Sequence, residues 1–167
     1  TIIDNASDDP EAIRLFEQTK HTVSRVPHPG QKFNFSHLVN QGVEQADTPY
    51  VLLLNDDTEA VSSRWLSQMV GFLGMEGVEA VGAKLLFPNK TIQHAGIIHG
   101  LGGGLAGPAF RNAARTDPGY LNYLRVPRNY SAVTAACLLT TKKVFLETGG
   151  VDETQFAVAY NDVDFGY

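Results

Sequence analysis

Tyr50-Val51-Leu52-Leu53-Leu54, followed at once by Asn55-Asp56-Asp57, is the stretch that decides the fold. An unbroken apolar run of this length, rich in branched residues, indicates a strand buried on both faces, as in a parallel sheet. Open α/β sheets bind their ligands at the carboxyl ends of such strands. Carboxylate oxygens at that edge suit Mg²⁺ or Mn²⁺ and, through the metal, a diphosphate. A solvated turn rich in aspartate is the alternative that this run alone leaves open.

Strands and helices are predicted to alternate along the rest of the chain. A strand at Ile2-Ile3 ends at Asp4, and Asp9 caps a helix that begins at Pro10. The further predicted elements are a strand from His21 to Val26 ended by Pro27, a helix from Phe35 to Ala46, a helix capped by Ser62 or Ser63 with an apolar stripe of Trp65, Leu66, Met69, Val70 and Leu73, a strand within residues 78–87, a strand at residues 132–141 and a helix at residues 142–148 stopped by Gly149-Gly150. This order predicts an α/β fold with a mostly parallel central sheet flanked by helices.

The composition is that of one globular domain spanning residues 1–167. Hydrophobic residues make up 43% and charged residues 19%, and the net charge is -5 without any run of Lys or Arg. A nucleic-acid-binding surface would need a basic patch, so no nucleic-acid partner is expected. The single cysteine, Cys137, lies in an apolar run. It excludes an internal disulfide framework and indicates a small core residue in a reducing cytoplasm.

Acidic residues follow the predicted strands. Asp4 could accept hydrogen bonds from a nucleobase or a ribose, or it could serve in the turn. If the middle strand continues through Asp56 and Asp57, their side chains alternate, so that one faces a metal and the other a ribose hydroxyl. A metal there would neutralise a diphosphate leaving group. Near the end of the chain, one carboxylate of Asn161-Asp162-Val163-Asp164 could take the proton of an acceptor hydroxyl, or the group could cap a helix.

The middle of the chain is predicted to be irregular. Residues 99–129 are rich in Gly, Pro, Arg and Asn and have no clear period, which indicates a long loop. Gly102, Gly104 and Gly107 match the spacing of a dinucleotide fingerprint, but Pro108 follows at once and no helix opens there. His94 and His99 are expected to be satisfied loop histidines, with a ligand or substrate contact as the alternative.

Several segments, in this order and at these spacings, resemble a known family. They are Ile2–Asp8, Leu53–Thr58, Gly149–Glu153 and Asn161–Asp164, with Gly82–Leu85, Ile92–Gly96 and Ser131–Cys137 between them. The set resembles family 2 glycosyltransferases with the GT-A fold, and the middle stretches are similar to the bacterial, rhamnosyltransferase-like branch that builds surface polysaccharides. The resemblance covers nearly the whole chain. The family's first nucleotide-binding strand and the helix expected after Asp164 are not found in this sequence. The chain is therefore expected to be a domain fragment truncated at both ends.

The resemblance implies a donor site and a catalytic base. Asp4 would contact the donor nucleobase, and Asp57 would hold Mg²⁺ or Mn²⁺. Asp56 would face the donor ribose or the waters of the metal. Asn55 is assigned to the donor site as well, although it stands where an Asp is common. Asp162 would be the base of an inverting displacement.

The resemblance also implies an acceptor side, to which Gly149, Gly150, Asn161 and His94 are assigned. Asn161 stands where many members have Glu. The donor would be a UDP- or TDP-linked sugar and the acceptor a saccharide or a lipid-linked saccharide. The expected place is the cytoplasm, with the inner face of the membrane, reached through regions outside this sequence, as the alternative. An exposed sheet edge could promote a homodimer. A non-catalytic binding module of the same fold and a nucleotidyltransferase are the alternatives.

Overall fold

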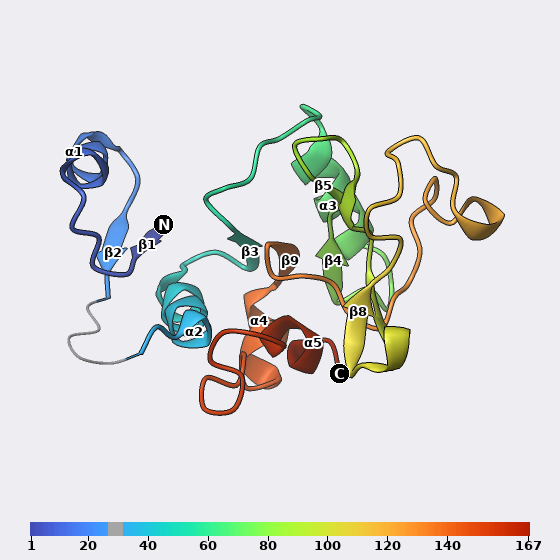
Figure 1. The fold of residues 1–167 in the computed structure, drawn as a ribbon. Helices are drawn as coiled ribbons and strands as arrows, with labels where there is room; N and C mark the ends of the chain where they lie inside the picture. Colours follow the sequence, from blue (N-terminus) through green and yellow to red (C-terminus); the bar gives the residue numbers. More distant parts are fainter. Residues whose placement is uncertain (27–31) are drawn as a thin grey trace.

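The computed structural model describes residues 1–26 and 32–167, so the predicted strand stop at Pro27 lies outside the described residues. Figure 1 shows the order of the elements. They are β1 (Ile2–Asp4), α1 (Pro10–Gln18), β2 (Val23–Arg25), α2 (Phe35–Gln45), β3 (Tyr50–Leu54), α3 (Trp65–Leu73), β4 (Ala80–Gly82), β5 (Leu85–Leu86), β6 (Ile92–His94), β7 (Ile97–His99), β8 (Ala106–Pro108), β9 (Cys137–Thr141), α4 (Lys142–Glu147) and α5 (Asn161–Phe165), with 3₁₀ turns at Leu101–Gly103 and Tyr120–Asn122.

The central sheet has the strand order β3–β9–β4, and β9 runs antiparallel to both neighbours. The α/β class is therefore confirmed, but the prediction of a mostly parallel central sheet is wrong. The chain leaves β4 at Gly82 and returns to the same edge, where Leu138 pairs with Gly82 and Cys137 with Leu54. Because β9 enters from that edge, it has to run against β4. The carboxyl ends of β3 and β4 and the amino end of β9 consequently meet at one edge.

Helices cover both faces of this sheet. On one face Val51 of β3 packs with Val43 of α2 and Phe145 of α4. On the other face Cys137 and Leu139 of β9 pack with Met69 and Leu73 of α3, and Leu52 of β3 lies against this second cluster. Successive residues of a strand point to opposite faces, so β3 contributes to both cores. This confirms the prediction from its apolar run and places Cys137 in the core.

Of the predicted helix caps of α1 and α3, that of α1 is confirmed and that of α3 is wrong. The Asp9 carboxylate accepts hydrogen bonds from the backbone N–H groups of Glu11 and Ala12, and Pro10 is the first helical residue, as predicted. The prediction for α3 is wrong, because its cap is Arg64, without a side-chain capping bond. Ser62 instead accepts a hydrogen bond from the Arg64 N–H in the turn before the helix. The predicted apolar stripe of α3 is also only partly inside, since Leu66 and Val70 are exposed.

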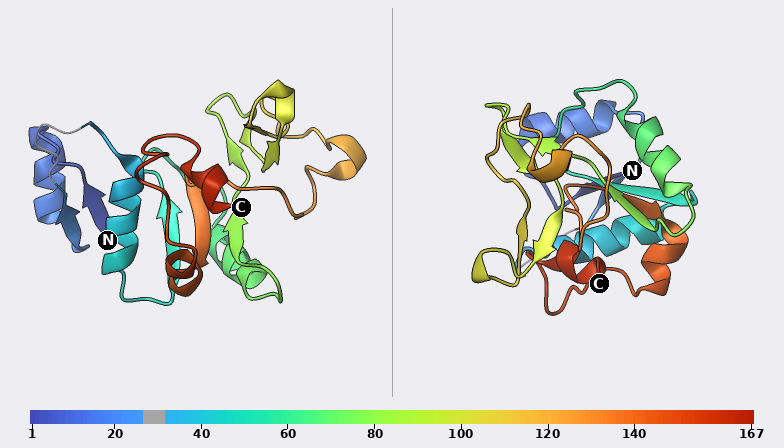
Figure 2. Two further views of the ribbon diagram at one scale, coloured as in Figure 1. Left: turned by 90° about the horizontal axis from the view of Figure 1, so that it is seen from below. Right: turned by 90° about the vertical axis from the view of Figure 1, so that its right-hand side faces the viewer.

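Two smaller units flank the central sheet (Figures 1 and 2). At one end β1 and β2 form a parallel pair beneath α1. A Cβ at Gly42 of α2 would lie 3.0 Å from Ile3 Cγ1, so β1 packs closely on α2. At the other end lie β5–β8 and the following irregular segment. The region predicted as a patternless loop contains β8, which pairs with β7.

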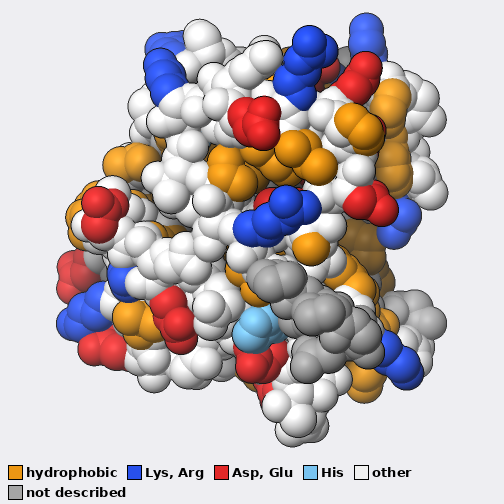
Figure 3. All heavy atoms as spheres, turned by 90° about the vertical axis from the view of Figure 1, so that its left-hand side faces the viewer, with side chains coloured by type: hydrophobic (Ala, Val, Ile, Leu, Met, Phe, Trp, Pro, Cys, Tyr) orange, Lys and Arg blue, Asp and Glu red, His pale blue; other side chains and the backbone are white. Residues whose placement is uncertain are grey.

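The distribution of charged side chains on the surface agrees with a sequence that has no run of Lys or Arg. On the face shown in Figure 3, basic and acidic side chains are interspersed among hydrophobic ones rather than gathered by sign. None of the helices within residues 1–26 and 32–167 combines the length and apolar character that a membrane crossing requires.

Candidate active site

Asp4 is held inside the turn that follows β1. Its side chain is 2% exposed, and one carboxylate oxygen accepts hydrogen bonds from the Ser7 N–H (2.9 Å) and the Ser7 hydroxyl (2.6 Å). The other oxygen lies 3.1 Å from Arg25 Nε. Burial by itself raises the pKa of Asp4, but the Ser7 hydrogen bonds and the Arg25 charge outweigh it and hold the pKa below its usual value. Both oxygens of this predicted nucleobase contact are therefore engaged within the protein.

Asn55, Asp56 and Asp57 form a turn directly after β3. The Asn55 N–H donates to the Ala136 carbonyl (3.0 Å), and the Thr58 hydroxyl donates to the Asn55 carbonyl (2.7 Å). The strand ends at Leu54, so the condition under which Asp56 and Asp57 would alternate as strand residues is not met. Both carboxylates are instead exposed on the turn, open to a metal or a ligand.

A backbone segment of three residues connects this turn to two other predicted site residues. The Thr134 N–H points to His94 Nε2 (3.4 Å), and the Ala135 N–H donates to Asp162 Oδ2 (3.2 Å). The Ala136 carbonyl accepts the hydrogen bond from Asn55. We call residues 134–136 the bridging segment. It brings together at one sheet edge residues that are far apart in the sequence.

His94 is buried at the end of β6, only 4% exposed. Its Nε2 accepts hydrogen bonds from the backbone N–H groups of Gly96 (3.2 Å) and Thr134 (3.4 Å). Burial lowers the pKa of His94 to about 4, although the Asp162 charge acts in the opposite direction. The ring is therefore neutral at physiological pH, with its proton on Nδ1. The prediction of a satisfied histidine is confirmed for His94, in a strand end rather than in a loop. It is wrong for His99 at the end of β7, whose buried Nε2 has no hydrogen-bond partner among the residues that the structure describes.

A cavity of about 360 Å³ opens beside Asp162 and His94. Arg111 contributes the positive charge among its lining residues and Asp162 the negative charge. The lining comes from the strands β5–β8 and the turn after β8, from the bridging segment, and from the last residues before α5 and the start of that helix: Leu85, Gln93, His94, Ile97, Ala106, Gly107, Pro108, Arg111, Thr134, Ala136, Ala159, Tyr160, Asp162 and Val163. A carboxylate beside a partly apolar cavity of this size can take a proton from a hydroxyl group of a molecule bound there.

The other residues assigned to the acceptor lie elsewhere. Gly149 and Gly150 end α4 in left-handed backbone, with φ of 89° and 74°. Their N–H groups donate to the carbonyls of Leu146 and Phe145, the Schellman arrangement. Both glycines line a different hollow, of about 670 Å³, together with Asp164.

Asn161 is turned into the protein. It is 4% exposed, and its amide donates a hydrogen bond to the Ser36 hydroxyl (3.0 Å). It does not line the cavity that holds Asp162. Sequence reasoning missed Ser36, which is fully buried and whose hydroxyl also donates to the Phe156 carbonyl (2.6 Å). An isolated serine in the first turn of a helix offers no signal for such a partner.

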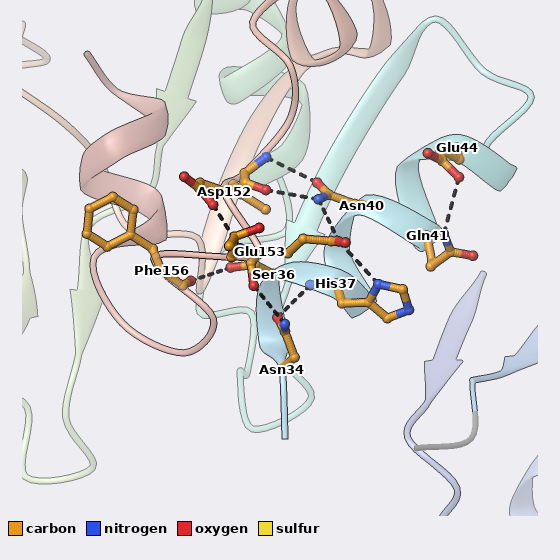
Figure 4. A network of polar contacts seen from close by, with 11 residues as sticks. Asn34, Ser36, His37, Asn40, Gln41, Glu44, Asp152, Glu153 and Phe156 are labelled. Atoms are coloured by element: carbon orange, nitrogen blue, oxygen red, sulfur yellow. Dashed lines mark hydrogen bonds and ion pairs between the residues drawn. The ribbon is translucent and has the colours of Figure 1, made fainter. Parts of the chain in front are cut away.

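A polar network ties α2 to the loop before α5 (Figure 4). The Asn40 side chain pairs with the backbone of Val151, donating to its carbonyl (2.9 Å) and accepting from its N–H (3.1 Å). Glu153 lies 3.1 Å from His37 Nδ1 and accepts from Asn40 (3.2 Å). Asn34, the cap of α2, donates to the Glu153 carbonyl (2.9 Å). The loop that leads to Asp162 is thus fastened to α2.

The exposed carboxylates of Asp56 and Asp57 suit a metal ion that a bound ligand also coordinates. Among the residues that the structure describes, no three His, Cys, Asp or Glu side chains gather into a complete metal site. Mg²⁺ commonly takes one or two protein carboxylates and completes its shell with phosphate oxygens and water. Asp56 and Asp57 fit that partial role.

The fold, together with the carboxylates at one edge of the central sheet, defines a class of protein. Residues 1–145 match the family described as Glycosyl transferase family 2, and the chain belongs to that family. Asp162 lies beyond the matched residues.

The chain is similar to larger proteins. It is 39% identical over 165 residues to the uncharacterized protein y4gI of Sinorhizobium fredii (strain NBRC 101917 / NGR234), covering 98% of this chain and 18% of that protein. It is 34% identical over 168 residues to the O-antigen biosynthesis protein RfbC of Myxococcus xanthus, covering 99% of this chain and 13% of that protein. The chain thus spans less than a fifth of the length of these curated relatives.

A solved structure has a similar fold. It is the mannosyltransferase PcManGT from Pyrobaculum calidifontis in complex with GDP-Man and Mn²⁺, with a TM-score of 0.59 and 17% identity over 97% of this chain and 39% of that one. The likeness confirms the predicted GT-A fold.

Proposed function

We propose that this chain forms the catalytic region of an inverting, metal-dependent glycosyltransferase that uses a nucleoside-diphosphate sugar. The observation that carries the proposal is the bridging segment, which joins Asp162 to the Asn55 turn beside a cavity. An inverting transfer needs a base on the acceptor hydroxyl and a group that neutralises the leaving diphosphate. Asp162 and the Asp56-Asp57 turn supply these two groups from one sheet edge.

Asp162 would take the proton of the acceptor hydroxyl. Its Oδ2 accepts from the Ala135 N–H and its Oδ1 from the Val163 N–H (2.9 Å), which fixes the plane of the carboxylate. The acceptor oxygen then forms a bond to the anomeric carbon while the bond from that carbon to the diphosphate breaks, and the nucleoside diphosphate leaves. The proton remains on Asp162. A single displacement of this kind inverts the anomeric centre.

Asp57 would hold Mg²⁺ or Mn²⁺, with Asp56 and Asn55 toward the ribose or the waters of the metal. When bound, the ion would neutralise charge on the leaving diphosphate. The PcManGT complex with GDP-Man and Mn²⁺ supports this kind of donor and metal for the fold. Asp4 would act at the nucleobase, with its carboxylate oriented by Ser7 and Arg25. The name of the RfbC relative supports a role in polysaccharide assembly, with a saccharide or lipid-linked acceptor.

The test is a donor screen on the full-length protein, measuring nucleoside diphosphate release with and without Mn²⁺. Asp162→Asn keeps the shape of the side chain but removes the base, and we expect turnover to fall by about 10²–10⁴-fold. Asp164→Asn is its matched control, because Asp164 lies on the same short helix but lines the other hollow. Asp57→Asn should abolish the turnover that Mn²⁺ supports, whereas the exposed Asp47→Asn should not. Wild-type turnover in Asp162→Asn would refute its role as the base.

A non-catalytic binding module is the second candidate. Two observations favour it: both Asp4 oxygens are engaged by Ser7 and Arg25, and the buried amide of Asn161 takes the place of a second carboxylate. Calorimetry of the full-length protein with Mn²⁺ and UDP- or TDP-sugars separates the two candidates. Acceptor binding without nucleotide or metal binding would favour the module.

A further inference from the structure

We propose that His94 is a positioning residue for the base, holding Asp162 in place through the Thr134–Ala135 backbone. The inference rests on the proposed function and adds to it a residue that acts without touching the reacting atoms. Its basis is a chain of two contacts. The Thr134 N–H points to His94 Nε2 (3.4 Å), and the next N–H along the backbone, that of Ala135, donates to Asp162 Oδ2 (3.2 Å).

The Nε2 atom of His94 is already used inside the protein. A neutral imidazole nitrogen has one lone pair, and here the N–H groups of Gly96 and Thr134 share it. The side chain is 4% exposed. A substrate contact at Nε2 would require both backbone bonds to break, so this nitrogen serves the fold of the site rather than the acceptor.

The turn that carries His94 is itself rigid. Gly96 has a φ of 109°, and a Cβ there would meet the Tyr130 ring at 2.2 Å, so the aromatic ring lies directly on this glycine. The Ile97 N–H donates to the Ala132 carbonyl (2.9 Å), and the Ser131 N–H donates to the Ile97 carbonyl (3.1 Å). The histidine therefore stands on a fixed support beside the start of the bridging segment. A fixed acceptor at Nε2 can hold Thr134, and through it the direction of the Ala135 N–H.

Two other roles for His94 make different predictions. As an acceptor contact it would work through Nδ1, the nitrogen that the backbone does not use. As a proton carrier it would need a group that titrates. Glutamine can place an amide oxygen near the position of Nε2, whereas asparagine reaches only the position of Nδ1, and neither amide titrates. The pair His94→Gln and His94→Asn therefore separates the three roles.

The experiment measures kcat and the KM of donor and acceptor in the full-length protein for His94→Ala, His94→Asn and His94→Gln, beside Asp162→Asn. We expect His94→Ala and His94→Asn to lower kcat on the order of 10–100-fold, because a base displaced by about 1 Å costs a factor of this size. The donor KM should stay the same, and His94→Gln should restore most of the lost kcat. Thermal melting of each variant reports whether it is folded, and if His94→Ala does not fold, the Gln and Asn pair decides.

Three outcomes would overturn the proposal. Wild-type kcat in both His94→Ala and His94→Asn means that His94 has no role in positioning. Activity retained in His94→Asn but lost in His94→Gln means a contact through Nδ1. Equal loss in all three folded variants means proton transfer by the ring. Full activity in Asp162→Asn would instead refute the proposed base, which is a separate failure.

Discussion

The side-chain amide of Asn161 donates a hydrogen bond to the hydroxyl of Ser36 across 3.0 Å, and both side chains are buried. The Ser36 hydroxyl donates a hydrogen bond to the Phe156 carbonyl (2.6 Å), and the Ser36 N–H donates to the Ala157 carbonyl (3.1 Å). The first turn of α2 therefore holds both the loop before α5 and the first residue of α5. Because Asp162 is the next residue after Asn161, this contact also positions Asp162.

The Ser36–Asn161 contact should be important for stability. Ser36→Ala leaves the Asn161 amide and the Phe156 carbonyl with only the long hydrogen bond between them (3.5 Å), so we expect the free energy of unfolding to fall by about 1–3 kcal/mol. Urea unfolding measures this. Ser67→Ala is the matched control, since the exposed Ser67 hydroxyl donates to the Arg64 carbonyl (3.0 Å) and its loss should change stability by no more than about 0.5 kcal/mol. Equal stability of Ser36→Ala and the wild type would contradict the reading of this contact.

Local signals predicted the parts of the fold that local physics determines. Asp9 before Pro10 starts a helix because a carboxylate can satisfy the first free N–H groups and proline has none to lose. The apolar run at residues 51–53 forms a strand with helices on both faces because it has no polar side to present to water. The direction of β9 could not be predicted in this way, since it depends on the edge at which the chain returns after residue 82.

The acidic residues of the candidate site could be predicted from the sequence, but the contacts that join them could not. Asp57 and Asp162 stand out as carboxylates at element ends. What joins them is backbone: the N–H of Ala135 and the carbonyl of Ala136. Every residue has these groups, so no side chain indicates which of them will be used. The resemblance assigns Asn161 to the acceptor side, whereas its burial depends on Ser36 in a distant helix.

Gly150 and Gly149 should differ sharply when replaced by alanine. Both have positive φ, so either alanine should cost about 1–2 kcal/mol from the left-handed backbone alone. A Cβ at Gly149 meets nothing within 4 Å, but one at Gly150 would lie 2.6 Å from Asn40 Oδ1 and 3.1 Å from Phe145 Cε1. Gly150→Ala should therefore also break the pairing of Asn40 with Val151 and be the less stable variant. Equal unfolding midpoints for the two alanines would contradict this contact.

Asp4 should stabilise the protein as a carboxylate. Its pKa is lower in the folded protein than the ordinary 3.8, so its stabilisation is present above that pH and is lost as the pH falls through the folded value. Asp4→Asn should cost about 1–3 kcal/mol at neutral pH, because the hydrogen bonds from Ser7 lose a charged acceptor. Unfolding at pH 7 and pH 3 measures this, and the difference between wild type and Asp4→Asn should shrink at the lower pH. Asp8→Asn, in the same turn and exposed, is the control.

His94 should make the protein sensitive to acid in a higher pH range. Its pKa is about 4 in the folded protein against an ordinary 6.5, because burial disfavours the imidazolium, while the facing Asp162 carboxylate opposes the shift and Arg111 is the other charged group lining the cavity. The unfolded chain therefore takes up the proton first. Stability is complete above pH 6.5 and falls by about 3 kcal/mol in total as the pH drops toward 4.

Urea unfolding between pH 7.5 and pH 4 tests the contribution of His94. His94→Gln cannot take up the proton, so its stability should fall less over this range than that of the wild type. The Asp4 effect lies below pH 3.8 and does not overlap. His21→Gln replaces an exposed histidine and should keep the wild-type slope. If His94→Gln and the wild type lost stability in parallel, the pKa of His94 would be the same in the folded and the unfolded protein, which would contradict its burial as a neutral ring.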